Sequence, residues 1–265
     1  MYKKSNFKKQ ESTPNDTSWN NVAKWYDTFV GDVGGKFHQD LIVPLVDEML
    51  ALKPDLSILD LGCGQGFYSR HLVSLNKQLN IVGIDKSSEL IKIAKQRGDK
   101  GIKYLSADAT NLEVIKDMGF DRIICILAIQ NMDPLEKVFS WCNRLLNKGG
   151  QLVIVTTHPA FRIPRQSGWG IDEGRKLQYR RVDSYMSVMK IPIIAHPGQQ
   201  NKIATWTFHR PLEKYVEDLS THGFVIDKLK EVISNKKSEK GKFSKAEDTA
   251  RLEIPMFIAI RALKI

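Results

Sequence analysis

The chain has 265 residues, 42% of them hydrophobic, and a formal net charge of +10. This length and composition predict one large α/β domain, or a domain with an insertion, and exclude a globally disordered chain. No apolar run approaches the roughly 18 residues of a membrane span, and the lysine-rich start lacks the apolar block of a signal peptide. The three cysteines have no metal-like spacing, so we expect a reduced, cytoplasmic protein without a metal site.

The basic excess lies in peripheral segments. Residues 1–15 are polar and rich in lysine, which predicts a disordered tail ahead of a single domain over residues 16–265. Two further basic segments lie in the middle of the chain and near its end. Such clusters can bind nucleic acid or an anionic substrate, but we favour the interpretation that they form a solvated surface.

Two helices are expected before the first strand. Apolar residues recur on one side of residues 19–29, which predicts a short amphipathic helix. A second helix is predicted over residues 41–52, and Pro54 ends it.

A glycine turn follows the first strand. The apolar run of residues 57–61 ends in a turn that contains Gly62, Gly64 and Gly66, and a helix begins directly after it. This spacing is one residue shorter than the dinucleotide fingerprint G-x-G-x-x-G. Asp60, just before the turn, would repel a pyrophosphate but suits a ligand with an ammonium and a sulfonium group. On charge, S-adenosylmethionine is therefore favoured over a dinucleotide.

The residues around this turn resemble a known motif. Residues 59–66, Leu-Asp-Leu-Gly-Cys-Gly-Gln-Gly, resemble motif I of the class I S-adenosylmethionine-dependent methyltransferases. Trp-Tyr-Asp at 25–27, Phe-His at 37–38 and His-Arg-Pro-Leu at 209–212 resemble segments of the type 11 group. The resemblance implies a Rossmann-like, seven-stranded, mostly parallel sheet with an antiparallel last strand and helices on both faces. It covers residues 40–156 and, less closely, 205–265.

Acidic residues end the next two strands. Asp85 follows the strand at 79–84 and lies where a nucleotide fold positions an acid for the ribose hydroxyls. The resemblance implies that Asp108, after the strand at 102–106, accepts the adenine amino group beside the Ala109 backbone. It also makes Tyr26 and His38 candidates for the methionine end of the cofactor.

Each of these residues also has a structural interpretation. Either acid could instead cap a helix, and Tyr26 and His38 could be a packed side chain and a surface histidine. The candidate cofactor-binding residues are Tyr26, His38, Asp60, Gly62, Cys63, Gly64, Gly66, Asp85, Lys86, Asp108, Ala109 and Leu127.

The acceptor is expected at the carboxyl ends of the fourth and fifth strands, residues 120–127 and 151–156, because ligands bind at that edge of a parallel sheet. No Asn-Pro-Pro-Tyr sequence, typical of amide or base methylation, follows the fourth strand. Residues 157–205 interrupt the alternation of strands and helices. In the methyltransferase family that this chain resembles, this region often determines which acceptor is bound. We therefore interpret it as a small substrate-binding cap between strands five and six.

The last part of the chain returns to the alternation. Strands are predicted near residues 202–208, 223–227 and 254–263, with a helix from 211 to 222. The charged stretch 234–248 predicts a loop.

Methyl transfer from a sulfonium is an in-line displacement, so a protein mainly aligns donor and acceptor. For a hydroxyl acceptor a histidine could serve as base. His158 is the first candidate and His209 the second, ahead of His38 and His196; for each the alternative is a structural or surface histidine.

The sequence thus predicts a methyltransferase for a small molecule, acting on oxygen, nitrogen or carbon. An RNA or protein methyltransferase is one alternative, which the basic segments would support. A dinucleotide-dependent oxidoreductase or a non-catalytic nucleotide-binding module is the other.

Overall fold

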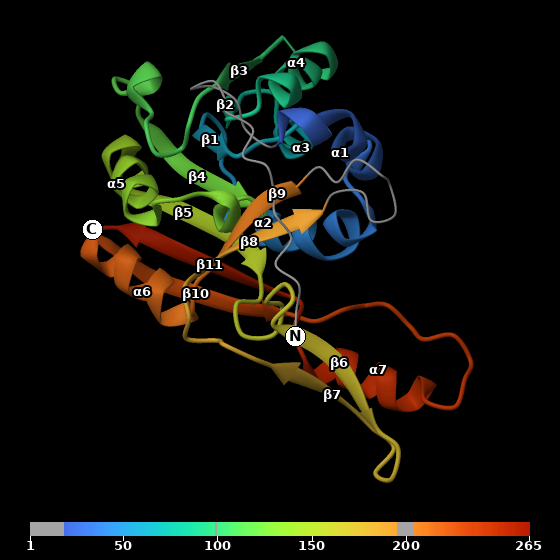
Figure 1. The fold of residues 1–265 in the computed structure, drawn as a ribbon. Coiled ribbons are helices and arrows are strands. Elements are labelled where there is room, and N and C mark those ends of the chain that lie inside the picture. The colour runs from blue at the N-terminus through green and yellow to red at the C-terminus, as the bar shows by residue number, and fades with distance from the viewer. Residues whose placement is uncertain (1–18, 99, 195–203) are drawn as a thin grey trace.

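The computed structural model describes residues 19–98, 100–194 and 204–265 (Figure 1). The predicted tail at residues 1–15 and the candidate base His196 lie outside the described residues. The helices are η1 (Asn20–Val22), α1 (Ala23–Val30), η2 (His38–Ile42), α2 (Val43–Leu50), α3 (Phe67–Leu75), α4 (Ser88–Arg97), η3 (Glu113–Ile115), η4 (Ile129–Asn131), α5 (Leu135–Leu145), α6 (Leu212–Thr221) and α7 (Ser244–Glu253). The strands are β1 (Ser57–Leu61), β2 (Asn80–Asp85), β3 (Ile102–Ser106), β4 (Phe120–Ile126), β5 (Leu146–Thr157), β6 (Ser167–Asp172), β7 (Leu177–Val182), β8 (Met189–Ile194), β9 (Ala204–His209), β10 (Phe224–Val232) and β11 (Phe257–Lys264).

Within the described ranges, seven strands form one sheet with the order β10-β11-β5-β4-β1-β2-β3. β1 pairs in parallel with β2 and β4, and the parallel pairing continues from β2 to β3 and from β4 to β5. β11 runs antiparallel to both β5 and β10. This confirms the predicted Rossmann-like sheet with an antiparallel last strand, and it places the carboxyl ends of β1, β2, β4 and β5 along one edge.

Each face of the sheet packs against its own set of helices. Alternate strand residues point to opposite faces, so Ile58 belongs to one core cluster and its neighbour Leu59 to the other. Residues of α1 to α4 complete the first cluster, and residues of α5 and α6 complete the second. Figure 1 shows these two helix groups on the two sides of the strands. The strands are therefore buried on both faces, which explains why they read as short, nearly continuous apolar runs.

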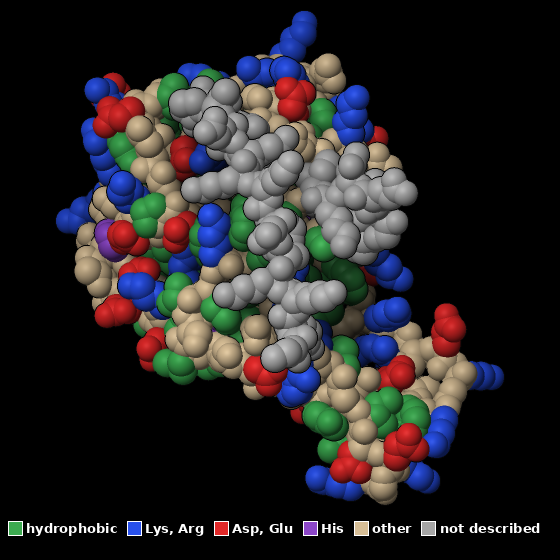
Figure 2. All heavy atoms as spheres, in the orientation of Figure 1, with side chains coloured by type: hydrophobic (Ala, Val, Ile, Leu, Met, Phe, Trp, Pro, Cys, Tyr) green, Lys and Arg blue, Asp and Glu red, His purple; other side chains and the backbone are tan. Residues whose placement is uncertain are grey.

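The region between β5 and α6 contains two antiparallel hairpins, β6–β7 and β8–β9. The β6–β7 hairpin extends away from the sheet, and α7 lies beside β7 (Figure 1). Figure 2 shows both basic and acidic side chains on this protruding part.

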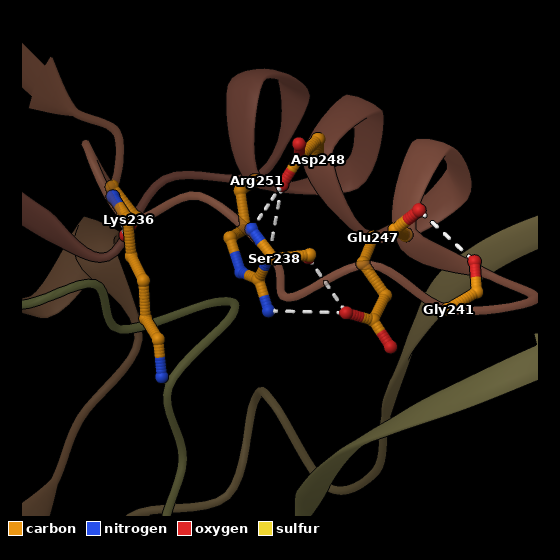
Figure 3. Close-up of polar contacts among 8 residues, drawn as sticks. Lys236, Ser238, Gly241, Glu247, Asp248 and Arg251 are labelled. Atoms are coloured by element: carbon orange, nitrogen blue, oxygen red, sulfur yellow. Dashed lines mark hydrogen bonds and ion pairs between the residues drawn. The ribbon is translucent and has the colours of Figure 1, made fainter.

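The prediction of a loop through residue 248 is wrong at its end, because α7 begins at Ser244. Four side chains of this segment, those of Ser238, Glu247, Asp248 and Arg251, contact one another (Figure 3). The Ser238 amide donates to Asp248 at 2.8 Å and its hydroxyl to Glu247 at 2.7 Å, while Arg251 pairs with Asp248 at 3.1 Å. Ion pairs between residues three and four positions apart support a helix in which few apolar residues are available. Throughout the described residues, no helix has the length and apolar character needed to cross a membrane.

Candidate cofactor and acceptor site

The glycine turn is built for close packing at the carboxyl end of β1. Gly62 has φ 76° and Gly66 has φ 79°, in the left-handed region that favours glycine. A Cβ on Gly62 would lie 2.5 Å from the Ala128 Cβ, and one on Gly66 would lie 2.4 Å from the Tyr104 hydroxyl. Neither position can carry a side chain, so the turn keeps its backbone close to its neighbours and α3 begins directly after it.

Asp60 lies one residue before the end of β1, and its carboxyl group is nearly buried. It is 3% exposed and accepts a hydrogen bond from the Ser69 hydroxyl at 2.6 Å. Burial raises the pKa of Asp60 to about 7, and the nearby Asp85 raises it further against the effect of Ser69. No ion pair to Asp60 occurs among the described residues. A buried carboxylate without a protein cation fits a positively charged ligand.

Asp85 lies next to this turn at the end of β2. One carboxylate oxygen accepts the Gly64 N–H at 3.0 Å and the other accepts the Ser87 N–H at 2.8 Å. Burial raises the pKa of Asp85, and these two backbone donors oppose the rise. The carboxylate is therefore held in one orientation, and each oxygen keeps a lone pair for a ligand hydroxyl.

Tyr26 of α1 covers the turn. Its ring edge would lie 3.3 Å from a Cβ on Gly64. Burial raises the pKa of Tyr26 well above its ordinary value, and Asp85 and Asp60 add to the rise. The hydroxyl therefore stays protonated and can donate a hydrogen bond to a ligand.

The N-terminal segment is tied to the turn by side chains that we did not single out from the sequence. The Gln65 amide donates to the Gly31 carbonyl at 2.6 Å, and Arg70 donates to the Asp32 carbonyl at 3.0 Å. Arg70 also donates to the Gln65 carbonyl at 2.7 Å. His38 packs edge-on against Phe67, with ring centroids 5.0 Å apart, and burial lowers its pKa.

Lys86 and Asp108 form an ion pair of 2.8 Å between the ends of β2 and β3. Burial opposes ionisation of Asp108, but the Lys86 ammonium and two donors of Thr110 outweigh it, so the pKa of Asp108 lies below its ordinary value. Asp108 is thus an ionised acceptor beside the buried Ala109.

Gln130 joins the ends of β4 and β5. Its side-chain N–H donates to the Leu127 carbonyl at 2.7 Å, and its side-chain oxygen accepts the Thr156 hydroxyl at 2.9 Å. Leu127 has φ 50°, an uncommon conformation for a residue with a side chain, and its N–H donates to Val155 at 2.7 Å. The sequence offered no local signal for Gln130, because its partner Thr156 lies 26 residues away.

His158 directly follows β5, and His209 is the last residue of β9. The two histidines differ in whether a ring nitrogen has a lone pair free to accept a proton. His158 is 4% exposed; its Nε2 lies 2.8 Å from Glu231, and its Nδ1 accepts the Ala160 N–H at 3.2 Å. The Nε2 of His209 donates to the Tyr185 carbonyl at 2.7 Å, which leaves Nδ1 as an acceptor. Burial lowers the pKa of both histidines. These tautomers follow from the partners, and they favour a structural role for His158, one of the two roles that the sequence left open.

The structure therefore brings Asp60, the glycine turn, Asp85 and Tyr26 together at one end of the sheet edge. Lys86, Asp108 and Ala109 continue this edge towards β3, and Leu127 stands at the end of β4. His209 lies on β9, in the region between β5 and α6.

Comparison with known proteins finds methyltransferases among the proteins to which this chain is similar. Residues 59–154 match the family described as methyltransferase domain. The chain is 33% identical over 115 residues to a demethylmenaquinone methyltransferase of Thermotoga maritima, covering 43% of this chain and 49% of that protein. It is also 33% identical over 111 residues to a ubiquinone/menaquinone biosynthesis C-methyltransferase of Campylobacter jejuni, covering 40% of this chain and 46% of that protein. The chain thus spans about half the length of these curated relatives.

Among solved structures, an S-adenosylmethionine-dependent methyltransferase from Mesorhizobium loti is 26% identical, with a TM-score of 0.64 over 83% of this chain and 96% of that one. The sheet order and the glycine turn define the class I methyltransferase fold. Residues 59–154 thus match the methyltransferase domain family, and the described chain has the fold of S-adenosylmethionine-dependent methyltransferases. S-adenosylmethionine is the cofactor of this class, and the buried Asp60 beside the glycine turn fits its positive charge.

Proposed function

We propose that this chain transfers the methyl group of S-adenosylmethionine to a small-molecule acceptor. The observation that carries the proposal is the pair of carboxyl groups beside the glycine turn and beneath Tyr26, the buried Asp60 and the partly buried Asp85. The cofactor supplies an already activated methyl group on its sulfonium. The protein's own part is to bind, orient and exclude water.

The proposed roles of the residues follow from their places along the sheet edge. Asp85 accepts the ribose hydroxyls, and Asp108 with the Ala109 backbone holds the adenine. Asp60, Tyr26 and His38 face the methionine end, and the backbone of Gly62, Cys63, Gly64 and Gly66 forms the floor. Lys86 keeps Asp108 ionised by their 2.8 Å ion pair, and Leu127 borders the site at β4.

The acceptor side of the proposal rests on the region between β5 and α6. We propose residues 157–205 as a substrate-binding cap within a single domain of residues 16–265. If the acceptor is a hydroxyl, His209 is the better placed base, because its Nδ1 lone pair is free whereas both ring nitrogens of His158 are engaged.

Two further observations support a small acceptor in a reducing compartment. The two curated relatives described above are named for quinone methylation, which is a small-molecule reaction. The cysteines at 63, 125 and 142 are all free and buried, which supports the proposed cytoplasmic location.

Calorimetric titration of the full chain with S-adenosylmethionine, S-adenosylhomocysteine and NAD tests the cofactor assignment. We expect both S-adenosyl ligands to bind and NAD not to bind, because a pyrophosphate would meet the Asp60 and Asp85 carboxylates. Binding of NAD alone would contradict the proposal. Acceptor screening then follows with small metabolites before RNA.

A further inference from the structure

A small pocket lies where the ends of β4 and β5 meet β9 and the start of α6. Its walls include Gln130, Thr156, Arg162, His209, Arg210 and Tyr215, and its volume is about 20 Å³. That volume admits about one water-sized group. The described residues that line it include two arginines and no carboxylate.

Arg210 lies over the Phe208 ring at 5.4 Å, and it offers this pocket a buried N–H without a hydrogen-bond acceptor. The residue is 4% exposed, and its Nη2 donates to the Met132 carbonyl at 2.9 Å and to Asp133 at 2.6 Å. Its Nη1 is buried and has no hydrogen-bond partner within the described part of the chain. Because a buried, charged N–H without an acceptor is costly, such groups are rare unless a water, ion or ligand completes them.

The charges around the pocket are also unbalanced. Arg162 donates only to backbone carbonyls, those of Pro255 at 3.2 Å and Ile254 at 3.5 Å. Burial, with the neighbouring Arg180, lowers the pKa of Arg162 to about 10. Asp133, which pairs with Arg210, is 50% exposed and lies outside the pocket lining. The pocket therefore favours an anion over a neutral group.

We propose that this pocket binds one oxygen of a carboxylate carried by the methyl acceptor, with Arg210 Nη1 as the donor and Arg162 as an additional positive charge. The inference rests on the proposed function, because it assigns the pocket to the acceptor. The planar guanidinium fork suits a carboxylate, and the small volume suits one of its oxygens better than a whole tetrahedral anion. The position at the ends of β4 and β5 is where an acceptor should meet the cofactor.

The test follows the side-chain Nε–H NMR signals of the full chain labelled with ¹⁵N-arginine. The Arg210 signal is assigned by its loss in Arg210→Lys, which keeps the charge. Acetate and acetamide, which differ in charge but hardly in size, are titrated at constant ionic strength. We expect acetate to shift the Arg210 signal with saturation and acetamide to leave it in place. No response to acetate, or equal responses to both, would overturn the proposal.

Two aspartate variants test whether Arg210 binds an anion or has only a structural role. Asp133→Asn removes the carboxylate that competes for Arg210, so the acetate Kd should fall about threefold. Asp183→Asn is the matched control, because Asp183 is also half-exposed and pairs with an arginine, Arg181, at 3.1 Å. It should leave the acetate Kd unchanged. Equal Kd values in both variants would contradict the site.

A final titration distinguishes the acceptor from the cofactor. Acetate binding is repeated with saturating S-adenosylhomocysteine, whose own binding is measured on the same sample. We expect both ligands to bind together. Displacement of acetate would assign the pocket to the carboxylate of the cofactor and overturn the acceptor assignment. If acetate binds but no S-adenosyl ligand does, the anion site stands and the proposed function fails.

Discussion

At the scale of single residues, Asp60 makes the folded protein sensitive to pH. Its folded pKa of about 7 lies above the ordinary 3.8, so the folded state binds the proton more tightly than the unfolded chain does. The resulting stabilisation is complete below about pH 4 and is lost as the pH rises towards 7. Asp60→Asn should remove this loss, so urea unfolding should show the variant gaining about 2 kcal/mol on the wild type between pH 5 and 7.

A constant difference between the two proteins over this range would contradict the raised pKa. The same substitution should weaken S-adenosylmethionine binding about tenfold, because the variant lacks the buried negative charge that complements the cofactor. Stability and affinity should therefore change in opposite directions.

Removal of the Asp85 carboxylate should weaken cofactor binding more than it lowers the stability of the fold. Asp85→Ala removes the proposed ribose acceptor and the bond to the Gly64 N–H, so calorimetry should show at least a tenfold (about 1.4 kcal/mol) loss of S-adenosylmethionine affinity. Asp117→Ala is the control, because Asp117 is an exposed aspartate away from the sheet edge. Unchanged affinity in Asp85→Ala would remove the ribose assignment.

At the scale of elements, the N-terminal segment acts as a cover that is tied to α4. Arg97 of α4 donates to Asp27 of α1 at 2.8 Å and pairs with Asp32 at 3.0 Å. Arg97→Met should loosen α1 at a cost of about 1 kcal/mol, because the pair with Asp27 is only partly exposed. Hydrogen exchange in residues 23–37 should become faster, and S-adenosylhomocysteine should dissociate a few times faster.

Lys92→Met provides the comparison, because Lys92 is an exposed cation of the same helix whose partner, Glu89, lies within α4. It should change neither the exchange of α1 nor the dissociation rate. If Arg97→Met behaves in the same way, the segment does not depend on α4 for its closure.

The sequence predicted those elements whose signal is local. Apolar runs in the sequence indicate four of the strands, β1, β2, β4 and β5. Closely spaced glycines indicate the turn after β1, and in the structure a Cβ on Gly62 or Gly66 would clash with a neighbour. The hairpin β6–β7 gave no such signal, because its strands are only half-buried. The helix α7 was hidden because its support comes from charged pairs in a segment whose composition is that of a loop.

The candidate site divides in the same way. Asp85 ends β2 and Asp60 lies one residue before the end of β1, so the place of both could be predicted from the order of strands and turns along the sequence. The contacts of Arg210 with Met132 and Asp133 join residues 78 and 77 positions apart, and its unpaired Nη1 is a property of the packed structure. The engaged nitrogens of His158 likewise depend on Glu231, 73 residues away, which is why the sequence alone ranked His158 ahead of His209.

At the scale of the whole molecule, the cofactor edge and the protruding part should respond separately to ligand. The edge includes the glycine turn and α1, whereas β6, β7 and α7 extend away from the sheet (Figure 1). A ligand that binds only the folded state stabilises it by about 2.7 kcal/mol at a hundred times its Kd. For a domain of this size that corresponds to roughly a 5–10 °C rise in Tm.

We therefore expect S-adenosylhomocysteine to raise the Tm and to slow hydrogen exchange at residues 23–38 and 62–66. Exchange in α7 should not change, because α7 opens locally and the ligand does not contact it. NAD at the same concentration is the control and should alter neither quantity. Protection of α7 by S-adenosylhomocysteine would instead show that the protruding part closes on the cofactor, and its hairpin would then belong to the binding site.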